Sequence, residues 1–278
     1  KGFPDYAKSK QYNIQWSHNQ DSKAAANSRF SASVNLGSSQ YYRQSVNMNN
    51  VGASLNNNLS SSVSYSKTFQ TVPQVNMSLS ATHSQNTNSQ QIDMTLPTFQ
   101  ASVDRIFPFA PKDGVKKGII KNINFQYNIR GENRIKTADS LFFKPQMFRD
   151  ARAGFQHSIP ISTNFKVLKH FSVSMGAGYN EVWAFNTIQK YFSPLENKII
   201  TEDQNGFESF RTYNLNAGIG TTVYGTFEFG KNSKIQAIRH VLRPNVSYGY
   251  TPSFEQYYDT YAIDATGLTT AEYTKFDR

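Results

Sequence analysis

Apolar and polar residues alternate between positions 213 and 229, and this pattern restricts the folds open to the chain. The odd positions form the apolar set, with Tyr213, Leu215, Ala217, Ile219, Val223, Phe227 and Phe229. The even positions are mostly polar, as at Asn214, Asn216, Thr222, Thr226 and Glu228. Side chains of a β-strand point alternately to its two faces, so the segment predicts one strand with an apolar and a polar face. At about 3.3 Å per residue it would span roughly 55 Å, far more than a usual globular strand.

A turn and a second alternating segment follow this strand. Gly230, Lys231, Asn232 and Ser233 supply turn residues, and Val246, Tyr248 and Tyr250 then alternate with Asn245, Ser247 and Gly249. Residues 213–254 therefore predict a long β-hairpin with a tight, basic turn. Long strands with one face lined by Ser and Asn favour the wall of a transmembrane β-barrel.

Composition supports a barrel over a helical membrane protein. The mean hydropathy is −0.57, yet aromatic residues make up 14% of the chain. A barrel needs this combination, because half of each strand faces water and aromatic girdles mark the membrane interfaces. The sequence has no run of 18 apolar residues, which excludes a membrane-spanning helix, and no cysteine, which excludes disulfides and thiolate metal sites. Residues 1–10 contain no apolar signal segment, as expected of a mature or truncated chain.

The formal net charge of +10 raises the question of a nucleic-acid partner. The basic residues are scattered and form no stripe along a helix, so no nucleic-acid binding is expected. Several gather near expected turns, including Lys166, Lys169, Arg239 and Arg243. Solvation of strand ends is the ordinary explanation for these residues. Attraction of an anionic lipid or glycolipid phosphate is the functional one.

Shorter alternating segments occupy much of the remaining chain. They are residues 12–16, 30–36, 51–55, 59–69, 75–81, 92–96, 99–103, 123–129, 153–161 and 171–179. Their spacing predicts an all-β, antiparallel meander, a partial transmembrane barrel of roughly ten to twelve strands. A soluble β-sandwich or a fibre protein shares this pattern. The uniformly Ser- and Asn-rich polar positions argue against the sandwich, whose exposed face usually carries Lys, Glu and Thr.

Two stretches lose the alternation and are expected to be excursions from the sheet. Residues 131–150 form the first, with Phe142, Phe143 and Phe148 as its anchors. Residues 186–211 form the second, where adjacent Asn205 and Gly206 give a hairpin signal.

Four segments carry a resemblance to a known family. Residues 96–109, 155–162, 179–183 and 238–248 resemble the barrel of the lipopolysaccharide-assembly protein family LptD. The most specific part places Arg239 and His240 before Leu242 and Pro244. The resemblance covers roughly residues 90 to 255, and the earlier residues show only the general barrel pattern.

The resemblance implies an integral outer-membrane translocon that takes lipopolysaccharide from periplasmic bridge proteins. Its barrel would hold a lipoprotein plug similar to LptE and release the glycolipid through a lateral seam, with no cofactor. The family's periplasmic β-jellyroll is missing here, and the strands are too few for its very large barrel. Residues 1–278 are therefore expected to be a transmembrane β-barrel fragment.

The resemblance supplies family-signature positions as candidate lipid contacts, namely Arg239, His240, Pro244, Glu181 and Trp183. Arg239 and His240 would meet lipid phosphates where a strand enters the membrane. Alternatively, Arg239 fills the lumen or pairs with a carboxylate such as Glu228 or Glu181. Pro244 has no N–H to donate, so it should lie at a bulge or an unpaired position. Trp183 is expected to anchor the interface.

Catalytic arrangements are absent from the sequence. Residues 225–231 match seven positions of a phosphate-binding loop, but Asn232 replaces the required Ser or Thr and no helix is expected to follow. The five histidines are dispersed without ligand spacing, and each is expected to be polar lining of the wet face. His157 and Ser158 are adjacent and point to opposite faces, which excludes a dyad. The chain is not expected to be an enzyme.

Three functions fit a barrel-like sequence of this kind. The first is export of lipopolysaccharide through a polar lumen, with lateral release of the acyl chains. The alternative is a porin-like or TonB-dependent receptor barrel that passes a soluble solute along its axis. A secreted structural β-protein is the third. An exporter needs a weakly paired seam, a porin needs a closed wall, and the structural protein would lack an aromatic belt.

Overall fold

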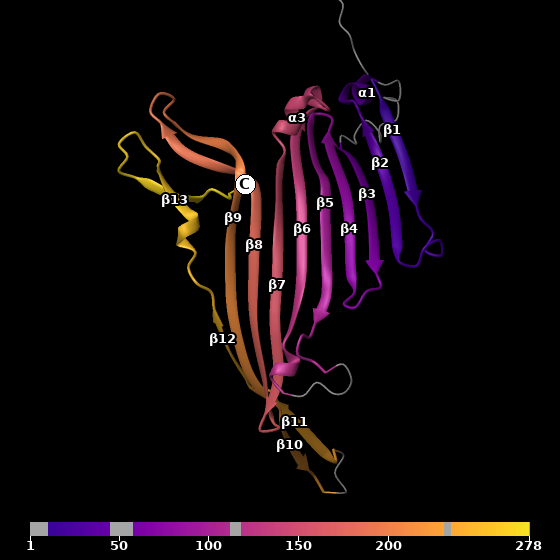
Figure 1. Ribbon diagram of the computed structural model, residues 1–278, viewed down its shortest axis with the longest axis vertical. Helices are drawn as coiled ribbons and strands as arrows, with labels where there is room; N and C mark the ends of the chain where they lie inside the picture. The colour runs from indigo at the N-terminus through magenta and orange to yellow at the C-terminus, as the bar shows by residue number, and fades with distance from the viewer. Residues whose placement is uncertain (1–10, 45–57, 112–117, 231–234, 278) are drawn as a thin grey trace, which may run out of the picture.

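Ten strands form one antiparallel sheet in the order β1 to β9 followed by β12 (Figure 1). The structure is a computed structural model that describes residues 11–44, 58–111, 118–230 and 235–277. The alternating segment expected at residues 51–55 and most of the turn expected at residues 230–233 lie outside the described residues. The strands are β1 (Asn13–Asn19), β2 (Ser28–Gly37), β3 (Asn58–Phe69), β4 (Val75–Asn86), β5 (Gln91–Ile106), β6 (Asn124–Ala138), β7 (Arg152–Val167), β8 (Phe171–Ser193), β9 (Lys198–Thr221) and β12 (Asn245–Tyr250). The open sheet confirms the predicted all-β, antiparallel meander of the partial-barrel type.

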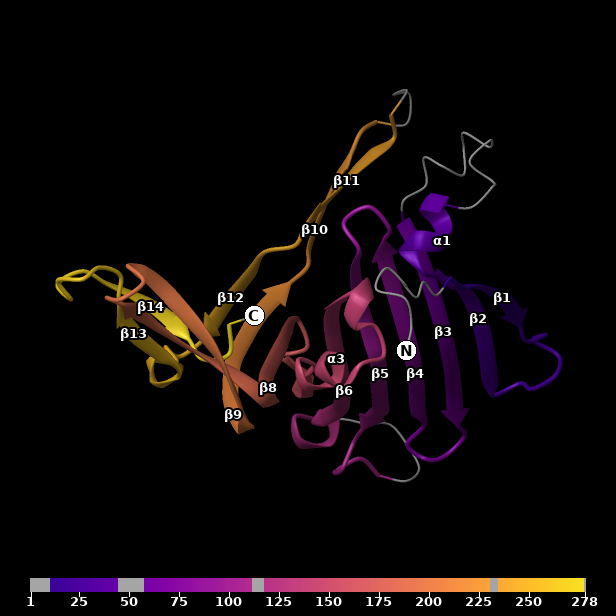
Figure 2. The same cartoon turned by 90° about the horizontal axis from the view of Figure 1, so that it is seen from above.

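The expected long hairpin is present but is interrupted. β9 ends at Thr221, and β10 (Val223–Glu228) then pairs with β11 (Ala237–Leu242). Pro244 lies in the gap between β11 and β12, as its missing N–H requires, while its carbonyl oxygen accepts a hydrogen bond from the Thr221 N–H at 3.1 Å. Figure 2 shows the β10 and β11 hairpin extending away from the sheet as an arm.

The excursion expected at residues 186–211 is wrong. β8 and β9 continue through it, and the reversal falls at residues 194–197. Asn205 lies within β9, where its side-chain oxygen accepts a hydrogen bond from Asn186 at 2.5 Å. The local turn signal failed because the pairing of β8 with β9 carries both strands through this stretch. Residues 201–205 have polar side chains on both faces, which is why the alternation is lost there.

The excursion expected at residues 131–150 is wrong in its first half. β6 runs on to Ala138, and only the short helices η3 (Asp139–Leu141) and α3 (Pro145–Arg149) leave the sheet. Met147 of α3 packs against Ile92, Met94 and Ile135, with Phe142 beside this buried cluster. The other short helices are α1 (Ser39–Gln44), η2 (Ile120–Asn122) and η4 (Glu255–Tyr257). Within the described residues, no helix is long and apolar enough to cross a bilayer.

A last hairpin, β13 (Tyr258–Ala262) with β14 (Thr270–Thr274), follows β12 beside the edge of the large sheet (Figure 1). The chain then returns to β8, where the Ile188 N–H donates to the carbonyl oxygen of Lys275 at 2.9 Å. Lys275 also forms an ion pair with Glu208 of β9 at 2.8 Å. The end of the chain therefore fastens the upper part of the β8 and β9 hairpin.

The register keeps the two faces of the sheet separate from β7 to β12. On one face, Ala177 lies opposite Ile161 and Leu215, and Leu215 lies opposite Tyr250. We call this the apolar face; Leu215 keeps 49% of its surface exposed there. The other, polar face carries Ser162, Gly176, Asn216 and Gly249 in the neighbouring register row. Burial of apolar surface stabilises a protein by about 25 cal/mol per Å², so an exposed apolar face of this extent marks a surface that contacts a membrane or another protein.

Candidate functional site

The polar face of β3 to β7 contains a hollow of about 540 Å³. Its lining is dominated by hydroxyl and amide side chains, among them Ser66, Asn76, Ser78, Gln100, Ser102, Asn128, Gln156 and Ser158. Five adjacent strands supply these groups. Every second residue of a strand points to the same face, and the strand pairing aligns these residues in rows across the sheet. Groups of this kind donate and accept hydrogen bonds without carrying charge, which suits the hydroxyls of a sugar chain.

Arginine side chains mark one end of this polar hollow. Arg130 lines it and binds Glu132 at 3.1 Å, and Arg134 binds the other oxygen of Glu132 at 2.8 Å. The alternation of β6 places these three side chains on the same face. Two cations share one carboxylate, and the arginine side chains remain 53% and 57% exposed. The cluster is therefore positively charged and suits phosphate groups.

Glycines give the polar face between β8 and β9 its flat surface. Asn214 lies over Gly178, and Asn216 lies over Gly176. A Cβ atom added at Gly176 would come within 2.8 Å of the Asn216 side-chain oxygen, and one at Gly178 would overlap Asn214. The two glycines thus let the amide groups lie across β8, which extends the uncharged polar lining toward β12.

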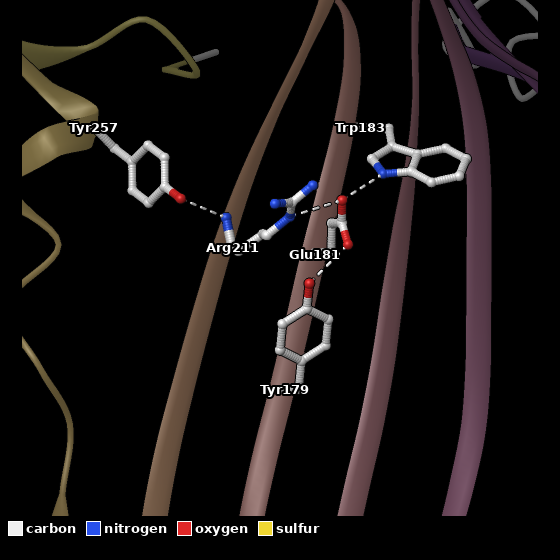
Figure 3. A network of polar contacts seen from close by, with 5 residues as sticks. All are labelled: Tyr179, Glu181, Trp183, Arg211 and Tyr257. Carbon is white, nitrogen blue, oxygen red and sulfur yellow. Dashed lines mark hydrogen bonds and ion pairs between the residues drawn. The ribbon is translucent and has the colours of Figure 1, made fainter.

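A polar network around Glu181 crosses the apolar face (Figure 3). Its Oε1 accepts hydrogen bonds from Trp183 Nε1 at 2.9 Å and Arg211 Nε at 3.1 Å, and its Oε2 accepts one from the Tyr179 hydroxyl at 2.8 Å. Glu181 and Arg211 are directly opposed in the register of β8 and β9. The backbone N–H of Arg211 donates to the Tyr257 hydroxyl at 3.0 Å, so η4 covers the edge of β9.

His157 extends this network to β7 and β6. Its ring lies 4.2 Å from that of Trp183, and its Nδ1 is 2.7 Å from the Tyr127 hydroxyl. The expectation that His157 is polar lining of the wet face is wrong, because its odd position in β7 places it on the apolar face, only 8% exposed. Sequence reasoning also missed Arg211. The available signal was its position two residues before Tyr213, which predicts that both side chains lie on the same face. Only the register of β8 with β9 shows that Arg211 meets Glu181.

The remaining signature positions lie elsewhere. Arg239 is on the arm, where its guanidinium carbon is 4.4 Å from the centre of the Tyr224 ring, and His240 pairs with Gly225. In the part of the chain that the structure describes, no ion pair joins Arg239 to a carboxylate. The suggested pairing with Glu181 is wrong, since Arg211 occupies that carboxylate. The structure thus unites Glu181 with Trp183 but keeps both apart from Arg239, His240 and Pro244.

The comparison with protein families agrees with the amphipathic sheet. A family model described as LptD protein matches residues 1–278. The chain belongs to the LptD family. LptD proteins are outer-membrane transport proteins that act on lipopolysaccharide. No curated protein and no solved structure matches the chain.

The LptD family consists of transport proteins and not of known enzymes. Among the described residues, His, Asp and Glu side chains form no group of three or more that could hold a metal ion. Hydrogen-bonding groups cover the polar face, and a charged network lies on the apolar face.

Proposed function

We propose that residues 1–278 form a wall segment of an outer-membrane translocon that delivers lipopolysaccharide to the outer leaflet. The sugars and phosphates pass along the polar face, and the acyl chains leave sideways into the membrane through a seam of the barrel. Guidance is passive, by exchange of hydrogen bonds along the wall, and involves no covalent chemistry.

The polar hollow of β3 to β7 carries this proposal. Its Ser, Asn and Gln side chains offer many weak partners, so a sugar chain exchanges one hydrogen bond for another as it moves. Arg130 and Arg134 stand at its end, and Glu132 lowers their joint charge. A partly neutralised cluster attracts phosphate but binds it weakly, so the phosphate can leave again, as transport requires.

The proposed translocon needs components beyond this segment. We assign residues 1–278 to the transmembrane barrel, with lipopolysaccharide supplied by periplasmic bridge proteins and a lipoprotein similar to LptE inside the barrel. The open sheet supports a place for such neighbours. Among the described residues, its edge strands β1 and β12 each pair with a single strand, and the outer edges of the sheet suit pairing with further barrel strands.

Photocrosslinking in intact cells tests this path. A photoreactive residue replaces Gln100, Asn128 or Asn214 on the polar face, and matched variants carry it at Leu79 or Phe99, which lie opposite each other on the apolar face. We expect adducts that migrate as lipopolysaccharide from the three polar positions at several times the yield of the apolar ones. In an assembled and functional protein, an absence of glycolipid adducts from all three polar positions would contradict the proposal and favour a porin-like or receptor-type barrel.

A further inference from the structure

A second hollow lies on the apolar face, across β7, β8, β9 and β12. It has a volume of about 550 Å³. Ile161, Met175 and Leu215 line it, and Tyr248 and Tyr250 of β12 complete its far side. Ala177 and Ala217 also line it, and their short side chains leave room between the larger neighbours. A barrel surface that only contacts bulk lipid needs no such recess, whereas a recess of this volume has room for a segment of an acyl chain.

The charged network lies directly beyond one end of this apolar hollow. The register runs from Ala177 opposite Leu215, through Tyr179 opposite Tyr213, to Glu181 opposite Arg211. Along β8 the step from Ala177 to Glu181 is about 13 Å, and alternation keeps both residues on the apolar face. This separation matches the arrangement of a membrane lipid, whose polar headgroup lies at the interface above its acyl chains.

Arg211 has donors left over for a ligand. Only its Nε binds Glu181, its side chain is 61% exposed, and the described residues give its two terminal nitrogens no further partner. A guanidinium has five N–H donors in a planar fork, and the outer ones suit the oxygens of a phosphate. The aromatic rings of Tyr179 and Trp183 flank the same carboxylate and offer faces to a cation.

The charges of the network decide which headgroup fits. A lone arginine would favour an anionic lipid, but Glu181 brings the pair close to neutrality and adds a negative partner beside the positive one. Such a pair complements a headgroup that itself carries a phosphate and an ammonium group. An anionic lipid would gain the contact with Arg211 and meet repulsion from Glu181.

We propose that this part of the apolar face is a specific site for a zwitterionic phospholipid of the membrane. Its phosphate binds the terminal nitrogens of Arg211, and its ammonium group lies by Glu181 and the neighbouring rings. One acyl chain occupies the hollow beside Ala177 and Ala217. This site lies on the opposite face of the sheet from the proposed lipopolysaccharide path, so the inference does not rest on that path.

Native mass spectrometry of the full-length protein tests the proposal. The protein, extracted in a non-ionic detergent, is titrated separately with dioleoylphosphatidylethanolamine, dioleoylphosphatidylglycerol and lipopolysaccharide. We expect phosphatidylethanolamine to bind at least about fivefold more tightly than the other two. Arg211→Ala should weaken that binding about tenfold through loss of a charge-assisted contact. Ala217→Phe should weaken it similarly by filling the hollow while leaving the polar network intact.

Two variants serve as matched controls in the same titrations. Lys169→Ala removes an exposed cation from the turn between β7 and β8, and Ala101→Phe adds the same bulk to the apolar side of β5. Both should bind phosphatidylethanolamine as the unchanged protein does. Equal affinity for all three lipids, a preference for lipopolysaccharide or phosphatidylglycerol, or unchanged binding in Ala217→Phe would overturn the proposal. Ala217→Phe decides the matter if Arg211→Ala fails to assemble.

Discussion

At the scale of single residues, Glu181 joins side chains of two neighbouring strands on the apolar face. Its two oxygens accept three side-chain hydrogen bonds, from β8 itself and from β9. A carboxylate at this position is stable because its charge is spread over these donors, in spite of the surrounding apolar side chains. Glu181 therefore fixes the rotamers of Tyr179, Trp183 and Arg211 at one level of the sheet.

Replacing this carboxylate should destabilise the protein measurably. Glu181→Ala leaves three donors without an acceptor, and we expect the free energy of unfolding to fall by about 1–3 kcal/mol. Denaturant titration of the protein in lipid vesicles, followed by tryptophan fluorescence, measures the change. Glu202→Ala is the matched control, since Glu202 accepts a single hydrogen bond, from Tyr191, at 2.6 Å. An equally large effect in both variants would show that the network contributes nothing specific.

At the scale of elements, close approaches between neighbouring strands shape the sheet. Gly131 of β6 lies opposite Phe155 of β7, and the Phe155 ring covers the glycine. The ring thus fills the space that a side chain would otherwise occupy. It covers the backbone of β6 at the glycine, where the strand has no side chain of its own to pack. Pro244 acts at the same scale, because a residue without an N–H separates the arm from β12.

A methyl group at Gly131 should disturb the pairing of β6 with β7. A Cβ atom there would overlap the Phe155 ring, so Gly131→Ala should lower the free energy of unfolding by about 1–3 kcal/mol. The double variant with Phe155→Leu should recover part of that loss, as measured by the same denaturant titration. Gly206→Ala is the control, since no atom lies within 4 Å of its added Cβ. A strictly additive double variant would contradict the proposed overlap.

At the scale of the whole molecule, the two faces of the sheet meet different media. Polar side chains and the arginine cluster cover one face of β3 to β9, and exposed Leu, Ile, Met and Tyr cover the other. This division agrees with the family's outer-membrane location, because the wall of a membrane β-barrel is apolar on its lipid-facing side and polar on its inner side. The helical segment around Met147 covers only the end of that face at β5 and β6.

Adjacent residues of β8 should respond in opposite ways to the same charge. Met175→Arg places a cation on the apolar face, which costs about 2–4 kcal/mol near the bilayer midplane, and should prevent assembly. Ser174→Arg places it on the polar face and should leave assembly intact. Heat-modifiable migration of outer-membrane protein on gels checks both variants. Normal assembly of Met175→Arg would show that this face does not contact lipid.

The sequence alone determined the alternation of apolar and polar residues, and with it the strands and their two faces. Alternation assigned the side chains of residues 213–221 in β9 to the two faces, and the spacing of such segments predicted the antiparallel meander. The sequence also predicted an unpaired position for Pro244, because its missing N–H is a local property, and Pro244 lies in the gap between β11 and β12. The family resemblance came from short segments such as 238–248, and the match over residues 1–278 confirmed it.

Tertiary structure alone decided which residues meet across the strands. Parity says that Glu181 and Arg211 share a face, but their contact depends on a register set by all of β8 and β9. The same register carried β9 through Asn205 and Gly206, where the local turn signal was strong. A turn signal depends on the conformational preferences of a few residues, whereas strand pairing depends on the summed contacts of two long strands. Here the pairing of β8 with β9 outweighed the turn preference of Asn205 and Gly206.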